Sequence, residues 1–182
     1  MSEAAVVAGR ACDGCTLCCK LVPVAALAKP AASWCRHCRI GGGCAVYADR
    51  PDECRDFNCA YLLDPALDAR WHPEQCKLVV AVDRQGTRIV VHVDPGRPDA
   101  WRKEPYYGAI KRWALAAVQA RRHVLIALGR NVIVVFPDHE KHLGPVREDQ
   151  FVYTFAKPTP AGIELDACVL EPDDPRVPRA AS

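Results

Sequence analysis

Residues 77–93 read KLVVAVDRQGTRIVVHV, and this stretch decides the fold that the sequence predicts. Two runs rich in β-branched residues, 77–82 and 87–93, are separated by the polar segment DRQG, which is a hairpin signal. The segment Asp94-Pro95-Gly96 then ends the second run with residues that favour a turn. We therefore expect two antiparallel strands here.

The chain beyond this hairpin alternates between a helical pattern and further strand patterns. Apolar residues recur at helical spacing in residues 105–122, with Pro105 in the first turn, where its missing N–H is harmless. Residues 123–128 and 131–136 predict a second hairpin, and residues 150–156 and 162–170 predict a third. The last residues, 171–182, contain three prolines and predict a disordered tail.

The predicted fold class is therefore α+β. A cysteine-rich, loop-dominated lobe at residues 10–62 packs on an antiparallel sheet with one main helix at residues 63–170, and the two form one compact unit. A length of 182 residues allows one domain that carries a small metal-bound lobe.

The lobe is marked by its cysteines, because nine of the eleven in the chain fall between Cys12 and Cys59. The block begins with residues 12–19, CDGCTLCC. Thiolates are soft ligands that suit zinc, copper(I) and iron–sulfur clusters, and a CxxC turn presents two sulfurs to one metal. A disulfide scaffold is the alternative. It is disfavoured because the start of the chain lacks an export signal, the cysteine count is odd, and the rest can form an ordinary core.

The spacing of the cysteines leaves the metal open between an iron–sulfur cluster and zinc. Cys12, Cys15 and Cys18 match the opening of a ferredoxin-type run, but its fourth position holds Val22. The pairs Cys12/Cys15 and Cys35/Cys38 instead form two CxxC motifs separated by nineteen residues, as in structural zinc sites. Neighbouring side chains diverge, so the adjacent Cys18 and Cys19 favour two centres, or one cluster with an extra thiolate nearby.

The motifs of this block carry a resemblance. CDGCTLCC, then Gly43-Cys44-Ala45-Val46-Tyr47, then RPDECRDFNC at residues 50–59, together resemble the CxxCxxCC cysteine-cluster family of YkgJ-like proteins, described as zinc- or iron-chelating. The match covers about residues 12–61. A similar cluster accompanies flagellin lysine N-methylases, so the resemblance implies a metal centre without implying a reaction. The ligands that it implies are Cys12, Cys15, Cys18, Cys19, Cys38, Cys44, Cys54 and Cys59. Cys35 lies outside this pattern and is either a substitute ligand or a separate thiol.

Two arginines among these cysteines are predicted to support the cofactor. Four thiolates on zinc or on an oxidised [4Fe-4S] core leave a net charge near −2, which a buried site tolerates poorly without donors. Arg50 and Arg55 are the donors that we expect, and the alternative is that they are exposed arginines near the site by chance.

Other side chains that could bind metal or take part in a reaction lie in weaker sequence patterns. Cys76 and Cys168 are expected to be small core residues. We expect His37 to point outward from its CxxC turn, and His139 and His142 to lie in a solvated turn. GxSxG, P-loop and GxGxxG motifs are absent from the sequence, so we lean against an enzyme. An iron–sulfur-dependent oxidoreductase or a modification accessory is the alternative.

The charge and hydropathy of the sequence limit which partners we expect. The formal net charge of +2 does not predict nucleic-acid binding, and no apolar run is long enough to span a membrane. We expect a cytoplasmic metal-binding protein whose iron–sulfur cluster (4Fe-4S) or zinc serves electron transfer, cluster carriage or redox sensing, with an unidentified protein as partner. The second hypothesis is a zinc-stabilised interaction module without catalytic activity.

Overall fold

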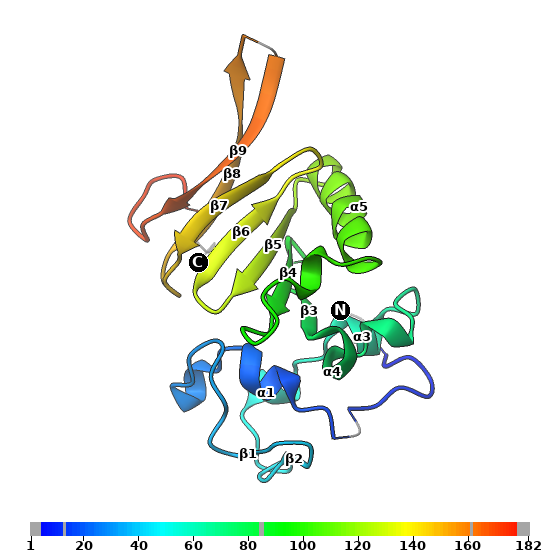
Figure 1. Cartoon of the computed structure of the whole chain (residues 1–182). Helices are drawn as coiled ribbons and strands as arrows, with labels where there is room; N and C mark the ends of the chain where they lie inside the picture. Colours follow the sequence, from blue (N-terminus) through cyan, green and yellow to red (C-terminus); the bar gives the residue numbers. More distant parts are fainter. Residues whose placement is uncertain (1–4, 13, 84–85, 161, 178–182) are drawn as a thin grey trace.

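The computed structural model describes residues 5–12, 14–83, 86–160 and 162–177. It shows an N-terminal lobe of short elements below a sheet that carries one long helix (Figure 1). The elements of the lobe are α1 (Leu17–Leu21), η1 (Ala25–Leu27), β1 (Cys38–Arg39), β2 (Gly43–Cys44), α2 (Asp52–Arg55) and α3 (Ala60–Leu63). The 3-10 helix η2 (Ala69–Trp71) and the helix α4 (Pro73–Cys76) connect the lobe to the sheet.

The central sheet has five strands in the spatial order β3-β4-β5-β6-β7. The strands are β3 (Leu78–Val82), β4 (Arg88–Val93), β5 (His123–Leu128), β6 (Asn131–Val135) and β7 (Glu140–Pro145). The first two predicted hairpins are present as β3–β4 and β5–β6, and the α+β class is confirmed. Residues 84 and 85, in the turn of the first hairpin, lie outside the described residues.

The sheet differs from the sequence prediction at two places. It is mixed, because β4 and β5 run parallel while the other pairs are antiparallel. A parallel pair needs a long crossover, and here η3 (Ala100–Arg102) and α5 (Tyr106–Gln119) supply it. The second difference is β7, which contains His142 in a stretch that we had interpreted as a solvated turn.

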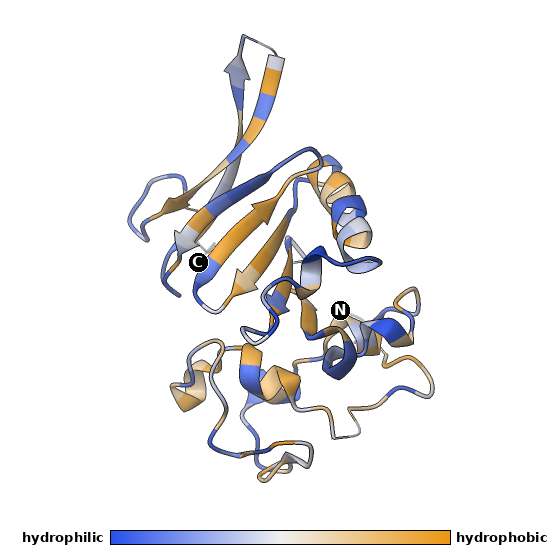
Figure 2. Ribbon diagram, in the orientation of Figure 1, coloured by the Kyte–Doolittle hydropathy of each residue, from blue (hydrophilic) through white to orange (hydrophobic). Residues whose placement is uncertain are grey.

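The helix α5 covers one face of the sheet, and its ends differ slightly from the predicted helix at residues 105–122. Pro105 is the N-cap residue of the helix and not part of its first turn. Ile110, Ala114 and Ala117 of α5 are buried against Val124, Ile126, Ile133 and Val135 of β5 and β6, and Trp101 of η3 completes this core. The strands of the sheet are accordingly hydrophobic, whereas β7 at the edge is largely hydrophilic (Figure 2).

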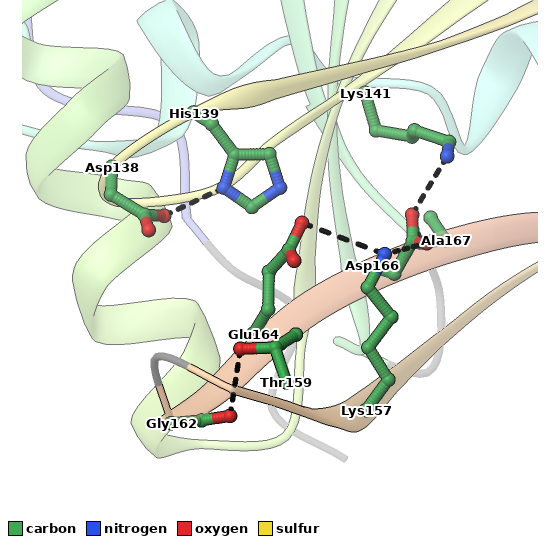
Figure 3. A network of polar contacts seen from close by, with 9 residues as sticks. All are labelled: Asp138, His139, Lys141, Lys157, Thr159, Gly162, Glu164, Asp166 and Ala167. Atoms are coloured by element: carbon green, nitrogen blue, oxygen red, sulfur yellow. Dashed lines mark hydrogen bonds and ion pairs between the residues drawn. The ribbon is translucent and has the colours of Figure 1, made fainter.

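The third predicted hairpin, β8 (Phe151–Thr159) and β9 (Gly162–Leu170), packs on the opposite face. Leu125 and Val134, whose side chains alternate with those facing α5, contact Ala167 of β9. Lys141 of β7 and Lys157 of β8 each bind Asp166 of β9 at 2.9 Å (Figure 3). The far end of the hairpin extends beyond the sheet (Figure 1).

The predicted disordered tail, residues 171–182, is described only as far as residue 177. In this part Arg176 lies 5.4 Å from the ring centre of Tyr153 on β8, and Val177 is buried. The described part of the tail is therefore attached to the third hairpin.

The lobe contacts the sheet through α1 and α3. Leu17 and Leu21 of α1 pack against Val79 on β3, and Cys15, Cys18 and Cys59 border this small core. Lys20 Nζ donates to Asp94 Oδ1 at 2.6 Å. The helix that carries two of the cysteines is thus fixed directly to the body of the protein. None of the helices in the described part of the chain has the length and hydropathy to cross a membrane.

Candidate metal centre

A cavity of about 400 Å³ lies in the lobe, and its wall contains seven cysteines. They are Cys12, Cys15, Cys18, Cys19, Cys35, Cys44 and Cys54. Six of the eight predicted ligands therefore line one cavity. The seventh cysteine of the wall is Cys35, which the family pattern had left out. The other two predicted ligands, Cys38 and Cys59, lie outside the wall but next to cysteines that belong to it: Cys38 contacts Cys19, and Cys59 lies near Cys12 and Cys15.

Short elements and tight turns bring these residues together. The helix α1 carries Cys18 and Cys19, and both line the same cavity although they are adjacent in sequence. The backbone N–H of Cys35 donates to the carbonyl of Cys19 at 2.9 Å, which brings the second CxxC turn to α1. The strand pair β1–β2 sets Cys38 opposite Cys44. Backbone hydrogen bonds thus help to bring the second CxxC turn to α1 and Cys38 to Cys44.

The thiols of the cavity interact with one another. Cys19 contacts both Cys18 and Cys38, and the hydrogen bond from Cys18 lowers the pKa of Cys19 while the same bond and burial raise that of Cys18. Burial raises the pKa of Cys15 and of Cys38 to about 11. Without a metal, Cys15 and Cys38 therefore stay protonated at neutral pH, whereas the pKa of Cys19 lies below its ordinary value.

Among the predicted arginines, Arg50 lies in the cavity wall and Arg55 does not. The Arg50 guanidinium stacks on Tyr47 at 3.9 Å from the ring centre, and its buried Nε has no hydrogen-bond partner among the described residues. A buried N–H without an acceptor is costly, so an anion in the cavity would stabilise it. The Arg55 side chain is 53% exposed and pairs with Asp52 at 2.9 Å. The structure therefore places Arg50 at the site and leaves Arg55 on the surface of α2.

The cation that sequence reasoning missed is Lys29. Its side chain lines the cavity although the residue is only 7% exposed, and it interacts electrostatically with Cys18, Cys19 and Cys35. Burial lowers the pKa of Lys29, and the nearby cysteines oppose this shift. The available signal was a single lysine that ends the apolar segment LVPVAALAK at residues 21–29.

The remaining candidates divide between this cavity and the rest of the molecule. His37 is half-buried and borders the cavity, and its Nε2 accepts from the exposed Arg36 Nε at 3.3 Å. His139 contacts Asp138 at 2.8 Å, far from any described cysteine in sequence. Cys76 is buried as expected, and burial raises its pKa to about 11. Cys168 is only half-buried on β9, so the expectation that it is a core residue is wrong.

The donor set fits a thiophilic metal or cluster in its chemistry but is not closed around one. Seven thiols, a buried cation and the unpartnered Nε of Arg50 surround one cavity. Among the described residues, however, no three His, Cys, Asp or Glu side chains are grouped so that they could hold a metal ion. Binding would therefore require the cysteines to move inward from the positions seen here.

Comparison with protein-family models, curated proteins and solved structures finds no match to this chain. The resemblance to the CxxCxxCC cysteine-cluster family stays a prediction that rests on the motifs alone.

Proposed function

We propose that the protein binds a metal cofactor in the cysteine-lined cavity and that this cofactor is an iron–sulfur cluster. One observation carries the proposal: seven cysteines from α1, α2, β2 and the turns beside them line a single cavity of about 400 Å³. Thiolates are the ligands that iron–sulfur clusters require, and such a cluster transfers single electrons when it is bound. The cysteines of the wall, together with Cys38 and Cys59, form the pool of ligands.

The size of the cavity favours a cluster over a single ion. A structural zinc site is closed by four ligands around one ion, whereas cofactor pockets have volumes of roughly 300–1,000 Å³. Lys29 and Arg50 lie in the wall and would offset the negative charge of a thiolate-bound centre of either kind. The function that follows is electron transfer, cluster carriage or redox sensing in the cytoplasm, where thiols stay reduced.

A zinc-stabilised interaction module is the second candidate, and the shortness of the lobe's elements favours it. The longest helix of the described lobe, α1, spans five residues, and its two strands span two residues each. A segment with so little regular structure is typical of modules whose folding depends on bound metal.

The test is metal and sulfide analysis with a visible spectrum, made on protein purified without air. We expect iron and sulfide with a broad visible absorption, and loss of both in Cys18→Ser. The matched control is Cys168→Ser, which removes a thiol outside the cavity and should retain the iron. Stoichiometric zinc in a colourless protein would support the interaction module instead. A chain that folds without iron or zinc, and takes up neither in reconstitution, would overturn both candidates.

A further inference from the structure

Lys29 is buried, and its ammonium group donates hydrogen bonds to backbone carbonyls. Its Nζ donates to the carbonyls of Val22 at 2.6 Å and of Lys20 and Pro30 at 3.2 Å. A lysine ammonium has three N–H donors, so three carbonyl acceptors satisfy it completely. These three hydrogen bonds hold the charge in one place, whereas the ammonium group of a surface lysine moves freely.

Two of these carbonyls lie at the C-terminal end of α1. A helix leaves its last carbonyls without partners inside the helix, and a cation near them is favourable. The helix α1 is short, so each bond at its end matters more than it would in a long helix. Lys29 and Val24 also pair through two backbone hydrogen bonds of 3.0 Å, which close the loop that returns the lysine to α1.

The charge of Lys29 also acts on cysteines of the cavity. The side chain belongs to the wall, and it interacts electrostatically with Cys18, Cys19, Cys35 and Cys54. These four cysteines come from three separate parts of the lobe, namely α1, the second CxxC turn and α2. Metal binding turns thiols into thiolates, so a positive charge held at this position stabilises the bound form more than the free form.

We infer that Lys29 is the positioning residue of the cysteine-lined cavity: it caps α1, which carries Cys18 and Cys19, and holds a buried positive charge against the thiolates that bind metal. This assignment rests on the proposed function. It predicts that Lys29 acts on metal affinity without touching the metal itself.

The test is competition titration of apoprotein with Zn²⁺ and a chromogenic chelator, under reducing conditions. Lys29→Met keeps the length of the side chain and removes its charge, and we expect it to lower zinc affinity roughly 10- to 100-fold. Lys29→Arg keeps the charge and should restore most of the affinity. The matched control is Lys103→Met, which removes the charge of an exposed lysine outside the cavity wall and should leave zinc affinity within about threefold of wild type.

A measurement on the unaltered protein covers the case in which Lys29→Met does not fold. Amine acylation followed by peptide mass analysis gives the labelling rate of each lysine with and without Zn²⁺. We expect zinc to slow labelling at Lys29 at least tenfold and to leave Lys111, on α5, unchanged.

The outcomes separate the two proposals. Wild type that binds zinc, with Lys29→Met binding equally well or with Lys29 labelling unchanged by zinc, would overturn the assignment of Lys29 and leave the metal-binding function standing. Wild type that binds neither zinc nor iron would overturn the function, and the assignment would fail with it.

Discussion

The cysteine-rich lobe and the sheet with α5 are held together by different means. Around Ile110 and Ile126 the sheet has a continuous apolar core in which the side chains themselves fix the strands and the helix. In the described part of the lobe, Leu17 and Leu21 form a small apolar cluster with Val79 of the sheet, and Ala60 and Tyr61 pack at the border of the sheet's own core. The comparison teaches that burial of apolar surface accounts for the order of the sheet, while the lobe depends on its attachment to β3 and on polar contacts.

The largest expected effect is in the sheet. Ile110→Ala removes a side chain that is 0% exposed, and we expect the free energy of unfolding to fall by about 2–5 kcal/mol. Leu115→Ala on the same helix is the control, because Leu115 is 52% exposed and its loss should cost within about 0.5 kcal/mol. Urea denaturation followed by circular dichroism measures both. Metal content per folded molecule should stay at the wild-type value, and a fall in it would break the distinction between the two regions.

An intermediate effect is expected where the two regions meet. Lys20→Met leaves the buried Asp94 carboxylate with the N–H of Gly96 but without its cation, which should cost about 1–3 kcal/mol. We expect faster tryptic cleavage of the lobe at the exposed Arg36 and Arg39, with amide protection in the sheet unchanged. The double variant Lys20→Met/Asp94→Asn should recover part of the loss. Equal loss of protection in both regions would show that they unfold as one unit.

The same ion pair predicts a pH dependence. Burial alone would raise the pKa of Asp94, but the hydrogen bonds from Lys20 and Gly96 outweigh it and hold the pKa below its ordinary value. The pair therefore contributes stability above the unfolded pKa of about 4, and this contribution is lost as the pH falls through the lower pKa of the folded state. The difference in melting temperature between wild type and Lys20→Met should shrink when measured below about pH 4. A difference that stays constant would contradict a role for this charge.

The smallest effect is expected at Arg55, and it sharpens the comparison within the lobe. Arg55→Ala removes an exposed ion pair with Asp52, so stability should change by about 0–1 kcal/mol and metal content should not change. Arg50→Ala removes the guanidinium in the cavity wall and should lower metal occupancy. Metal analysis of both variants decides whether the position in the wall or the mere presence of an arginine in this motif matters.

Local patterns in the sequence predicted most of the fold, and non-local contacts account for the differences. The three hairpins and α5 each lie in a continuous stretch with its own periodicity. The parallel pairing of β4 with β5 joins strands on either side of α5, and no local pattern encodes it. The strand β7 was missed because it is an edge strand with polar residues such as Lys141 and His142, whose charges suit an edge and hide a strand pattern.

The candidate site shows the same division between what local patterns predict and what non-local contacts decide. Of the eight cysteines that the resemblance implies as ligands, six line one cavity, and their role as ligands stays a prediction. The role of Lys29 depends on a loop that folds back onto α1 through Val24, and the position of Arg55 depends on which face of α2 turns outward. Neither could be predicted from spacing, because both are set by how short elements pack on one another.

The parallel pair β4–β5 has a consequence for the order of folding. Each antiparallel pair of the sheet closes a short loop, so its entropy of closure is small and it can form early. The pairing of β4 with β5 must close a loop that contains η3 and α5, and the entropy of that closure is larger. Proteins rich in such distant contacts fold more slowly. We therefore expect the pairing that joins the two halves of the sheet to form after the antiparallel pairs.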